Sequence, residues 1–383
     1  MIVVTGIGIV SALGVGVEEN YTALKSSKSG LDYIKNFQTN HHVPVGEVKY
    51  TNSQLKDLLG IPQRKIYSRT TLLGMLAARE AYKGAKISNG RVGLISSTSV
   101  GGMDLTEVFY PELKTELTLN KVVHHDSADS TINIANDLNI KGFSTTISTA
   151  CSSSANAIML GCRMLDMGLL DYVVVGGTDS LCKFTINGFS SLKILDENKC
   201  RPFCKTRSGL NLGEGAAYLV LERESDKPNY GKILGYANAN DATHQTATSD
   251  EGEGAYLSMT QALAKASISD TDIDYINVHG TATPNNDMSE GNAIKRVFTS
   301  FIPPFSSTKS YTGHCLAAAG SIEAVFSLLA IKNGALYPNL NISEPIEEAL
   351  TPNLEFTQGN KINIVMSNSF GFGGNCSTLI FSK

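Results

Sequence analysis

The amino-acid sequence predicts an α/β protein. Short apolar runs rich in β-branched residues recur along the chain, and longer segments with apolar residues at helical spacing separate them. The 35 glycines among 383 residues follow no fixed period, which indicates many tight turns rather than a repeat or a disordered linker. The strand-like runs span residues 2–5, 92–96, 144–149, 172–176, 217–221, 232–237, 275–278 and 362–366.

The first run lies in an opening segment, residues 1–16, that lacks the basic start of a secretory signal. Glycines interrupt its apolar residues, so a buried strand is expected there. The seven cysteines are odd in number and irregularly spaced, which is typical of reduced thiols and predicts a cytoplasmic protein. No membrane span is expected, because the longest apolar run, after His314, contains Glu323.

Charged residues make up only 18% of the chain, and the formal net charge is −4. A nucleic-acid binder that relies on a basic face is therefore not expected. The length predicts two or three packed units, and the polar stretch at residues 224–229 is the predicted boundary. We expect two halves, residues 1–228 and 229–383.

The two halves share one pattern. Residues 143–150 (FSTTISTA) precede the small-residue segment CSSSANAIMLGCRML, and residues 304–313 (PFSSTKSYTG) precede HCLAAAGSIEAVFSLLAI. Each half thus contains a strand, a turn of small residues and a buried helix rich in small residues. This pattern predicts a duplicated unit.

Four signatures of bound ions or nucleotides fail in this sequence. Gly6 and Gly8 lack the third glycine of a dinucleotide fingerprint, and no Walker lysine follows a glycine-rich loop. The aspartates at 270, 272 and 274 lack the glycine and the glutamate of a calcium loop. Cys200 and Cys204 have no second Cys or His pair at zinc-ligand spacing. We therefore expect no nucleotide site and no metal site.

Cys151 follows a strand-like run and opens a segment whose apolar residues have helical spacing. The free N–H groups of a helix N-terminus favour an anion, so a lowered thiol pKa and a nucleophilic role are expected. A cysteine among small residues more often fills a core, however. The position of Cys151 alone leaves both interpretations open.

Two histidines stand at junctions between a strand and a helix. His279 ends a strand-like run and precedes Gly-Thr-Ala-Thr-Pro, which places it at the carboxyl edge of a sheet. His314 begins the second buried helix, and Lys309 lies shortly before it at the end of another strand. A single buried histidine is usually only hydrogen-bonded, but two at such junctions in the same half favour a site.

Glu323 is the only charged residue between Cys315 and Ile331, in a helix that is otherwise apolar on all sides and therefore buried. A buried carboxylate needs a partner, and Lys309 or a histidine is the candidate; the pair is structural or functional. Near the C-terminus, glycines flank Phe372 within residues 368–375. They predict a loop whose N–H groups approach an oxyanion.

Taken in this order, these residues resemble those of the elongating β-ketoacyl-acyl carrier protein synthases, which are thiolase-fold condensing enzymes. The similarity extends from residue 3 to residue 374. The motifs that show this similarity are Thr-Ala-Cys-Ser-Ser at 149–153, Leu-Gly-Glu-Gly-Ala at 212–216, His-Gly-Thr-Ala-Thr-Pro at 279–284 and Thr-Lys-Ser-Tyr-Thr-Gly-His at 308–314. The implied fold is two similar βαβαβαββ halves in a five-layer αβαβα sandwich.

The resemblance also implies the role of each site residue. Cys151 would accept the acyl group, while its own N–H and that of Phe372 form the oxyanion hole. Neutral His279 and His314 would bind the malonyl thioester oxygen as CO2 leaves. The remaining implied roles are a supporting pair (Lys309, Glu323), a gate (Phe370, Phe372) and a pantetheine and substrate pocket (Thr281, Thr283, Phe189).

The implied partner is acyl carrier protein in its acyl and malonyl forms, which brings its own phosphopantetheine, so no free cofactor is expected. A homodimer is expected, with a heterodimer as the alternative. The nearest basic cluster for an acidic carrier consists of Arg64, Lys65 and Arg69 on an early helix, although an ordinary solvated face explains it as well.

Some positions depart from the family pattern. Cys204 and Ser208 stand where aspartates are frequent, Ala282 replaces the more usual Gly or Ser, and Asn375-Cys376 alters the ending. Together with the short chain, these departures make a specialised polyene or polyketide pathway a candidate beside fatty acid synthesis.

Three alternatives to a synthase fit the sequence less well. A noncatalytic chain-length-factor partner normally lacks the nucleophile that Cys151 supplies. A thiolase would need a second reactive cysteine before the glycines, and a cysteine hydrolase would leave His314 and Glu323 without roles.

Overall fold

Two sheets with the same strand order form the framework of the molecule. The computed structural model describes residues 1–87, 89–110, 122–224 and 228–383. Within these ranges, hydrogen bonds connect the strands in the order β11-β10-β12-β13-β9-β1-β8-β7-β5-β6, and β2 pairs with β1 beside this path. The pairing between β9 and β1 is confined to residues 2–4 of β1, so the sheet divides there into two parts.

The strands of the two parts correspond one to one. The first part contains β1 (Ile2–Ser11), β5 (Val92–Ser97), β6 (Ser144–Ile147), β7 (Tyr172–Asp179) and β8 (Gly215–Arg223). The second contains β9 (Gly231–Asn240), β10 (Tyr275–Asn277), β11 (Phe305–Ser306), β12 (Ile364–Gly371) and β13 (Asn375–Ser382). The short strands are β2 (Gly14–Val15), β3 (Asp32–Tyr33) and β4 (Pro44–Val45). The orders β6-β5-β7-β8-β1 and β11-β10-β12-β13-β9 are the same arrangement repeated.

Helices alternate with these strands. The helices that complete the repeat are α3 (Arg69–Ala85), α6 (Ser127–Asp137) and α7 (Ser153–Asp166) in the first half, and α9 (Glu253–Ala266), α10 (Pro284–Val297) and α12 (Ala319–Asn333) in the second. The others are α1 (Val17–Lys25), α2 (Asn52–Leu59), α4 (Met103–Phe109), α8 (Lys183–Ser191) and α11 (Lys309–Thr312). Short 3₁₀ turns are η2 (Val122–His125), η3 (Asp270–Asp272), η4 (Leu316–Ala318), η5 (Glu348–Leu350) and η6 (Phe372–Gly374). Each half therefore runs βαβαβαββ.

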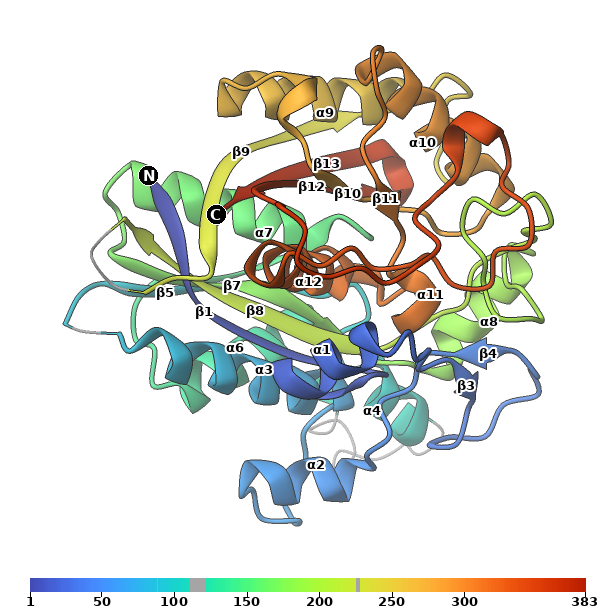
Figure 1. The fold of residues 1–383 in the computed structure, drawn as a ribbon. Helices are drawn as coiled ribbons and strands as arrows, with labels where there is room; N and C mark the ends of the chain where they lie inside the picture. The colour runs from blue at the N-terminus through green and yellow to red at the C-terminus, as the bar shows by residue number, and fades with distance from the viewer. Residues whose placement is uncertain (88, 111–121, 225–227) are drawn as a thin grey trace.

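The elements stack in five layers (Figure 1). Helices α9 and α10 cover the outer face of the second sheet, and α3 and α6 cover the outer face of the first. Between the sheets lie α7 and α12, which contact each other and both sheets. This αβαβα sandwich confirms the predicted thiolase-like fold.

Strand β1 is longer than its predicted run, because the glycines after that run do not end the strand. Gly6 and Gly8 lie inside the strand, and a Cβ atom at either position would come within 2.1 Å of a carbonyl oxygen of α3. They therefore allow α3 to pack closely on β1 instead of ending it. The strand expected before Lys309 is present as the two-residue β11, whereas the sequence did not predict β13, whose first residues are polar.

The segment Leu316–Asn333, which includes α12, is long and apolar enough by composition to cross a membrane. However, 89% of it is buried inside the protein. Its place between two sheets is that of a core helix.

Small residues allow the two central helices to cross closely. A Cβ atom on Gly320 of α12 would lie 3.0 Å from the Ala155 nitrogen and 3.1 Å from the Ala155 Cβ of α7. The run of small residues in both buried helices thus has a packing reason.

We expect Gly320→Ala to lower the free energy of unfolding by about 1–3 kcal/mol, because the added methyl group overpacks the contact between α7 and α12. Gly188→Ala in α8 is the matched control, since nothing lies within 4 Å of its added Cβ. The control should be neutral or stabilising by up to about 1 kcal/mol. Urea unfolding of both variants checks this, and equal stabilities would contradict the close crossing.

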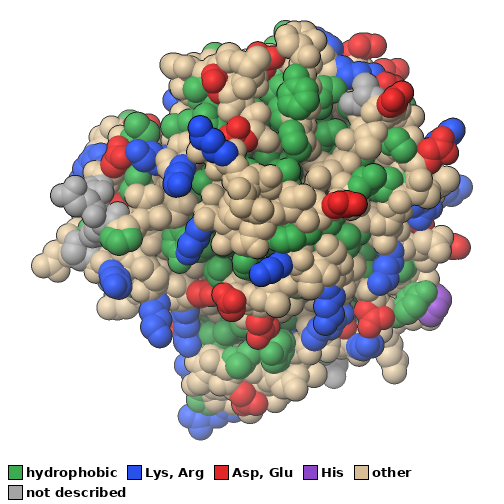
Figure 2. Space-filling model, viewed as in Figure 1, with side chains coloured by type: hydrophobic (Ala, Val, Ile, Leu, Met, Phe, Trp, Pro, Cys, Tyr) green, Lys and Arg blue, Asp and Glu red, His purple; other side chains and the backbone are tan. Residues whose placement is uncertain are grey.

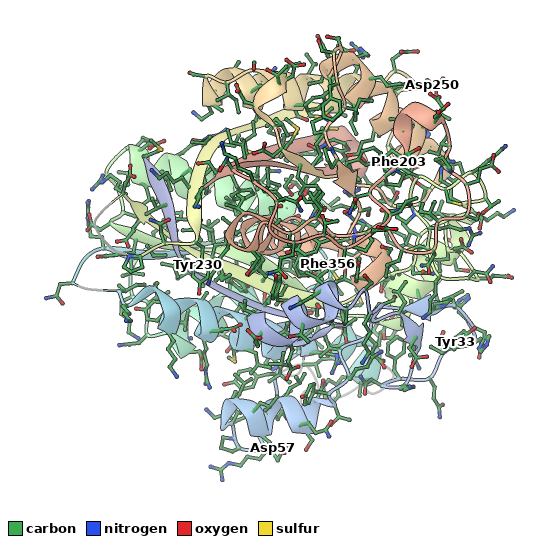
Figure 3. The ribbon with its side chains drawn as sticks, viewed as in Figure 1. Tyr33, Asp57, Phe203, Tyr230, Asp250 and Phe356 are labelled. Carbon is green, nitrogen blue, oxygen red and sulfur yellow. The ribbon has the colours of Figure 1, made fainter. Side chains whose placement is uncertain are left out.

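The predicted boundary at residues 224–229 falls between β8 and β9, and residues 225–227 lie outside the described residues. Figure 3 labels Tyr230 where the chain enters β9, and its N–H donates to the Val4 carbonyl at 2.8 Å. The division into domains 1–228 and 229–383 stays a prediction.

On the face drawn in Figure 2, acidic and basic side chains are intermixed. The predicted basic cluster on an early helix is wrong for Arg69. That side chain is buried at the start of α3 and pairs with Glu214, with its Nη2 2.6 Å from Oε1. Arg64 and Lys65 are exposed and lie before α3 rather than on it.

Candidate active site

Cys151 lies in a tight turn between β6 and α7. Ala150 before it has a φ of 53°, a left-handed conformation that is uncommon for alanine. The Ser153 hydroxyl holds the turn by accepting from the Thr149 N–H at 2.8 Å and donating to the Ala150 carbonyl. The cysteine is 6% exposed. As predicted, its thiol is presented near the N-terminus of a helix, here α7.

The thiol opens into a cavity of about 340 Å³. The cavity is lined by Cys151, both histidines and residues from the predicted pocket and gate; these are His279, His314, Phe189, Thr281, Thr283, Phe370 and Phe372. The rings of Phe189 and Phe372 stack at 5.9 Å, and the Thr281 and Thr283 hydroxyls lie 2.9 Å apart. The structure thus brings these predicted residues together around one space.

Sequence reasoning missed two other parts of the lining. They are a loop segment, residues 245–248, and the first turn of α10 with Asn285 and Asn286. None of these residues carries a sequence signal beyond ordinary polarity.

The two imidazoles line this cavity next to each other and pack edge to face. Their ring centroids are 5.4 Å apart with an interplanar angle of 84°. Burial, with a further contribution from the Lys309 charge, lowers the pKa of both His279 and His314 well below the usual value. Both rings are therefore neutral near pH 7 and can donate hydrogen bonds without carrying charge.

Lys309 and Glu323 support the histidines from behind the cavity. The Lys309 ammonium donates to a Glu323 carboxylate oxygen, and it donates to the His279 carbonyl at 2.6 Å. Its Nζ also lies 3.4 Å from His279 Nδ1. Lys309 was predicted at a strand end but begins the one-turn helix α11. The predicted partner of the buried Glu323 is thus confirmed as Lys309.

The Leu-Gly-Glu-Gly motif of the first half braces His314 of the second. The His314 N–H donates to the Asn211 carbonyl at 2.8 Å, and the Gly213 N–H donates to the His314 carbonyl at 2.9 Å. Glu214 accepts from Arg69 and from the Val48 and Leu181 N–H groups. This segment therefore holds the backbone of His314 from the other half of the chain.

Two further buried carboxylates support the site, and sequence reasoning missed both. Glu290 of α10 accepts the N–H groups of His279 and Gly280, each at 2.8 Å, and burial raises its pKa to about 7. Asp179 at the end of β7 accepts the Ala317 N–H at 2.8 Å and also binds the turn after β5. The sequence did not single out either residue, because one acidic residue in a polar helix or at a strand end is common.

The expected low pKa of Cys151 is wrong for the free protein. Burial raises the pKa of the thiol to about 11, because desolvation outweighs the Lys309 charge and the hydrogen bond from the Phe372 N–H. The sulfur therefore rests as a neutral thiol that touches the Phe372 N–H.

The loop with Cys204 and Ser208 is held in place despite its departures from the family pattern. The Cys204 sulfur lies 3.4 Å from the Ser343 and Thr206 hydroxyls, and the Arg201 guanidinium pairs with Asp196 at 3.2 Å. Phe203, labelled in Figure 3, packs edge-on against Phe305 with ring centroids 5.1 Å apart. Among the described residues, no group of three or more His, Cys, Asp or Glu side chains is arranged to hold a metal ion.

We expect the ring signals of His279 and His314 to stay constant in NMR spectra between about pH 8 and about pH 6. The unfolded chain binds a proton on each ring near pH 6.5, whereas the folded protein does not, so both groups reduce stability as the pH falls through this range. Spectra of His279→Gln and His314→Gln assign the signals. A titration of either ring within this range would contradict the neutral pair.

Comparison with known proteins identifies the family. Residues 1–227 match the family model of the β-ketoacyl synthase N-terminal domain, and residues 230–343 match that of the C-terminal domain. The chain belongs to the β-ketoacyl synthase family. The resemblance inferred from the motifs is thereby confirmed, and the chain is an acyltransferase-type condensing enzyme by this membership.

Relatives and solved structures agree with this assignment. The chain is 34% identical to 3-oxoacyl-[acyl-carrier-protein] synthase 2 of Staphylococcus aureus (strain COL), with 100% of this chain and 98% of the relative covered. Identity and coverage are the same for the Coxiella burnetii protein of that name. It is also similar to the ishigamide ketosynthase/chain length factor, with a TM-score of 0.91, 28% identity and coverage of 100% and 98%. A ketosynthase in complex with its chain length factor from Xenorhabdus doucetiae gives a TM-score of 0.86, 33% identity and coverage of 100% and 97%.

Proposed function

We propose that this β-ketoacyl synthase joins an acyl group on Cys151 to a malonyl group carried by acyl carrier protein, with loss of CO2. One observation carries the proposal: a cysteine and two neutral imidazoles line the same cavity, next to a buried Lys309–Glu323 pair. A nucleophile opposite two uncharged donors suits a reaction with an acyl-enzyme stage and an enolate stage.

In the first stage the Cys151 sulfur attacks the thioester carbonyl of the acyl carrier. The N–H groups of Cys151 and Phe372 hold the oxyanion, and both already lower the pKa of the sulfur. The bond from the carbonyl to the carrier sulfur breaks, and the proton lost by Cys151 ends on the departing carrier thiol. The acyl group stays on the enzyme.

In the second stage malonyl-carrier enters the same cavity. His279 and His314 donate to its thioester oxygen, which gains negative charge as the bond to the carboxylate breaks and CO2 leaves. The resulting carbanion attacks the acyl-Cys151 carbonyl, and the Cys151 sulfur departs. The product is a 3-oxoacyl thioester on the carrier, two carbons longer than the acyl group.

The remaining assignments belong to this proposal. Thr281, Thr283 and Phe189 contact the pantetheine arm and acyl chain, and Phe370 and Phe372 form the gate. The carrier brings the phosphopantetheine, so the enzyme needs no free cofactor. It acts in the cytoplasm as a homodimer, in fatty acid or in polyene or polyketide synthesis.

A noncatalytic chain-length-factor role is the second candidate, because two of the similar solved structures include such a partner by name. The presence of Cys151 in the cavity favours catalysis. The test is incubation with acyl-carrier and malonyl-carrier protein, followed by mass spectrometry. Acylation of Cys151 and a product longer by two carbons support the proposal, whereas an unmodified Cys151 under these conditions contradicts it.

A further inference from the structure

The two proposed oxyanion donors come from different halves of the chain. Cys151 belongs to the turn before α7, and Phe372 begins the η6 turn between β12 and β13. Gly371 lies against the first turn, since a Cβ there would be 3.1 Å from the Cys151 nitrogen. Two donors on separate segments stabilise an oxyanion only if their relative position is fixed to within about 0.5 Å.

One side chain connects these two segments directly. The Asn375 Oδ1 atom, just after the η6 turn, accepts from the Ser152 hydroxyl at 2.6 Å. It also accepts from the side-chain amides of Asn156 in α7 and Asn238 in β9, each at 2.8 Å. Ser152 follows Cys151 in the chain and is fully buried.

A second set of hydrogen bonds holds this cluster in shape. Asn156 Nδ2 donates to the Thr149 hydroxyl at 2.9 Å, and the Ser152 hydroxyl lies 2.8 Å from the Thr149 carbonyl. Asn156 Oδ1 accepts from Ser377 at 3.1 Å. None of these side chains lines the catalytic cavity.

We propose that Asn375 is a positioning residue that sets the distance between the Cys151 and Phe372 N–H groups through its bond to Ser152. The inference rests on the proposed function, because it concerns the oxyanion of acyl transfer. Sequence alone showed Asn375 only as a departure from the family ending, and its partners lie up to 223 residues away.

Two reactions of the same sulfur separate this role from a merely structural one. Acyl transfer passes through a tetrahedral oxyanion and needs both N–H donors. Alkylation by iodoacetamide is a displacement at a saturated carbon that expels iodide and forms no oxyanion. Loosening of the helix or a change in thiol pKa would alter both rates, whereas misplaced donors alter only the first.

We expect Asn375→Ala to slow acylation of Cys151 by acyl-carrier protein about 10- to 100-fold, with its alkylation rate within about threefold of wild type. Ser152→Ala, which removes the other end of the bond, should show the same selective loss. The double variant should be no slower than the slower single variant, because both remove one interaction.

Ser258→Ala is the matched control, since Ser258 is equally buried and bonds to Ala255 and Thr378 but to no residue of the cluster. It should keep both rates. Wild-type acylation rates in Asn375→Ala and Ser152→Ala, or equal loss of acylation and alkylation, would overturn the inference. Failure of the wild-type protein to become acylated would instead overturn the proposed function.

Discussion

Replacement of Cys151 by alanine is expected to abolish covalent loading of the acyl group. The cavity contains no other cysteine, and neither imidazole is placed to replace a thiol that touches the Phe372 N–H. We expect no acyl adduct by mass spectrometry and a fall in condensation of more than about a thousandfold, as for other nucleophile deletions.

The control for this prediction is Cys162→Ala. Cys162 lies in the same helix, α7, and is fully buried, but it does not line the cavity. The variant should lose some stability through the small void it creates, while its loading remains close to wild type. Loading of Cys151→Ala at the wild-type level would show that another group accepts the acyl chain.

The sequence predicts well which residues meet at the cavity, because each has a local signal. Cys151 and His279 stand where a strand ends, and Glu323 is a lone charge in an apolar helix. The partner of Glu323 could be proposed because burial of a charge requires one. The five-layer fold followed from the resemblance, and the repeated pattern of small residues pointed to its duplication.

The predictions that failed depend on contacts between residues that are distant in sequence. Arg69 looked like part of a basic surface cluster, but its partner Glu214 lies 145 residues further along the chain. The thiol pKa of Cys151 was predicted from the helix terminus alone, and desolvation by the surrounding halves reversed its direction. Glu290, Asp179 and Asn375 have no local signal, since their roles exist only once the two halves pack.

The second large effect concerns His314. Its neutral ring packs edge to face with His279, and its backbone is hydrogen-bonded to Asn211 and Gly213. Loading and condensation should therefore separate in His314→Ala. Loading uses the oxyanion donors of Cys151 and Phe372, and it should stay within about threefold of wild type, whereas the donor lost from the enolate stage should lower condensation about 100- to 1,000-fold.

Measurement of acyl-Cys151 by mass spectrometry and of CO2 released from malonyl-carrier protein distinguishes the two stages. His314→Gln, which can still donate from a neutral amide, should lie between alanine and wild type in CO2 release. His42→Ala is the control, since that ring stacks on Tyr33 at 4.1 Å and does not line the catalytic cavity. If His314→Ala released CO2 and condensed at the wild-type rate, the enolate would have to be stabilised elsewhere. If it lost loading as completely as Cys151→Ala, the imidazole would instead act in acyl transfer.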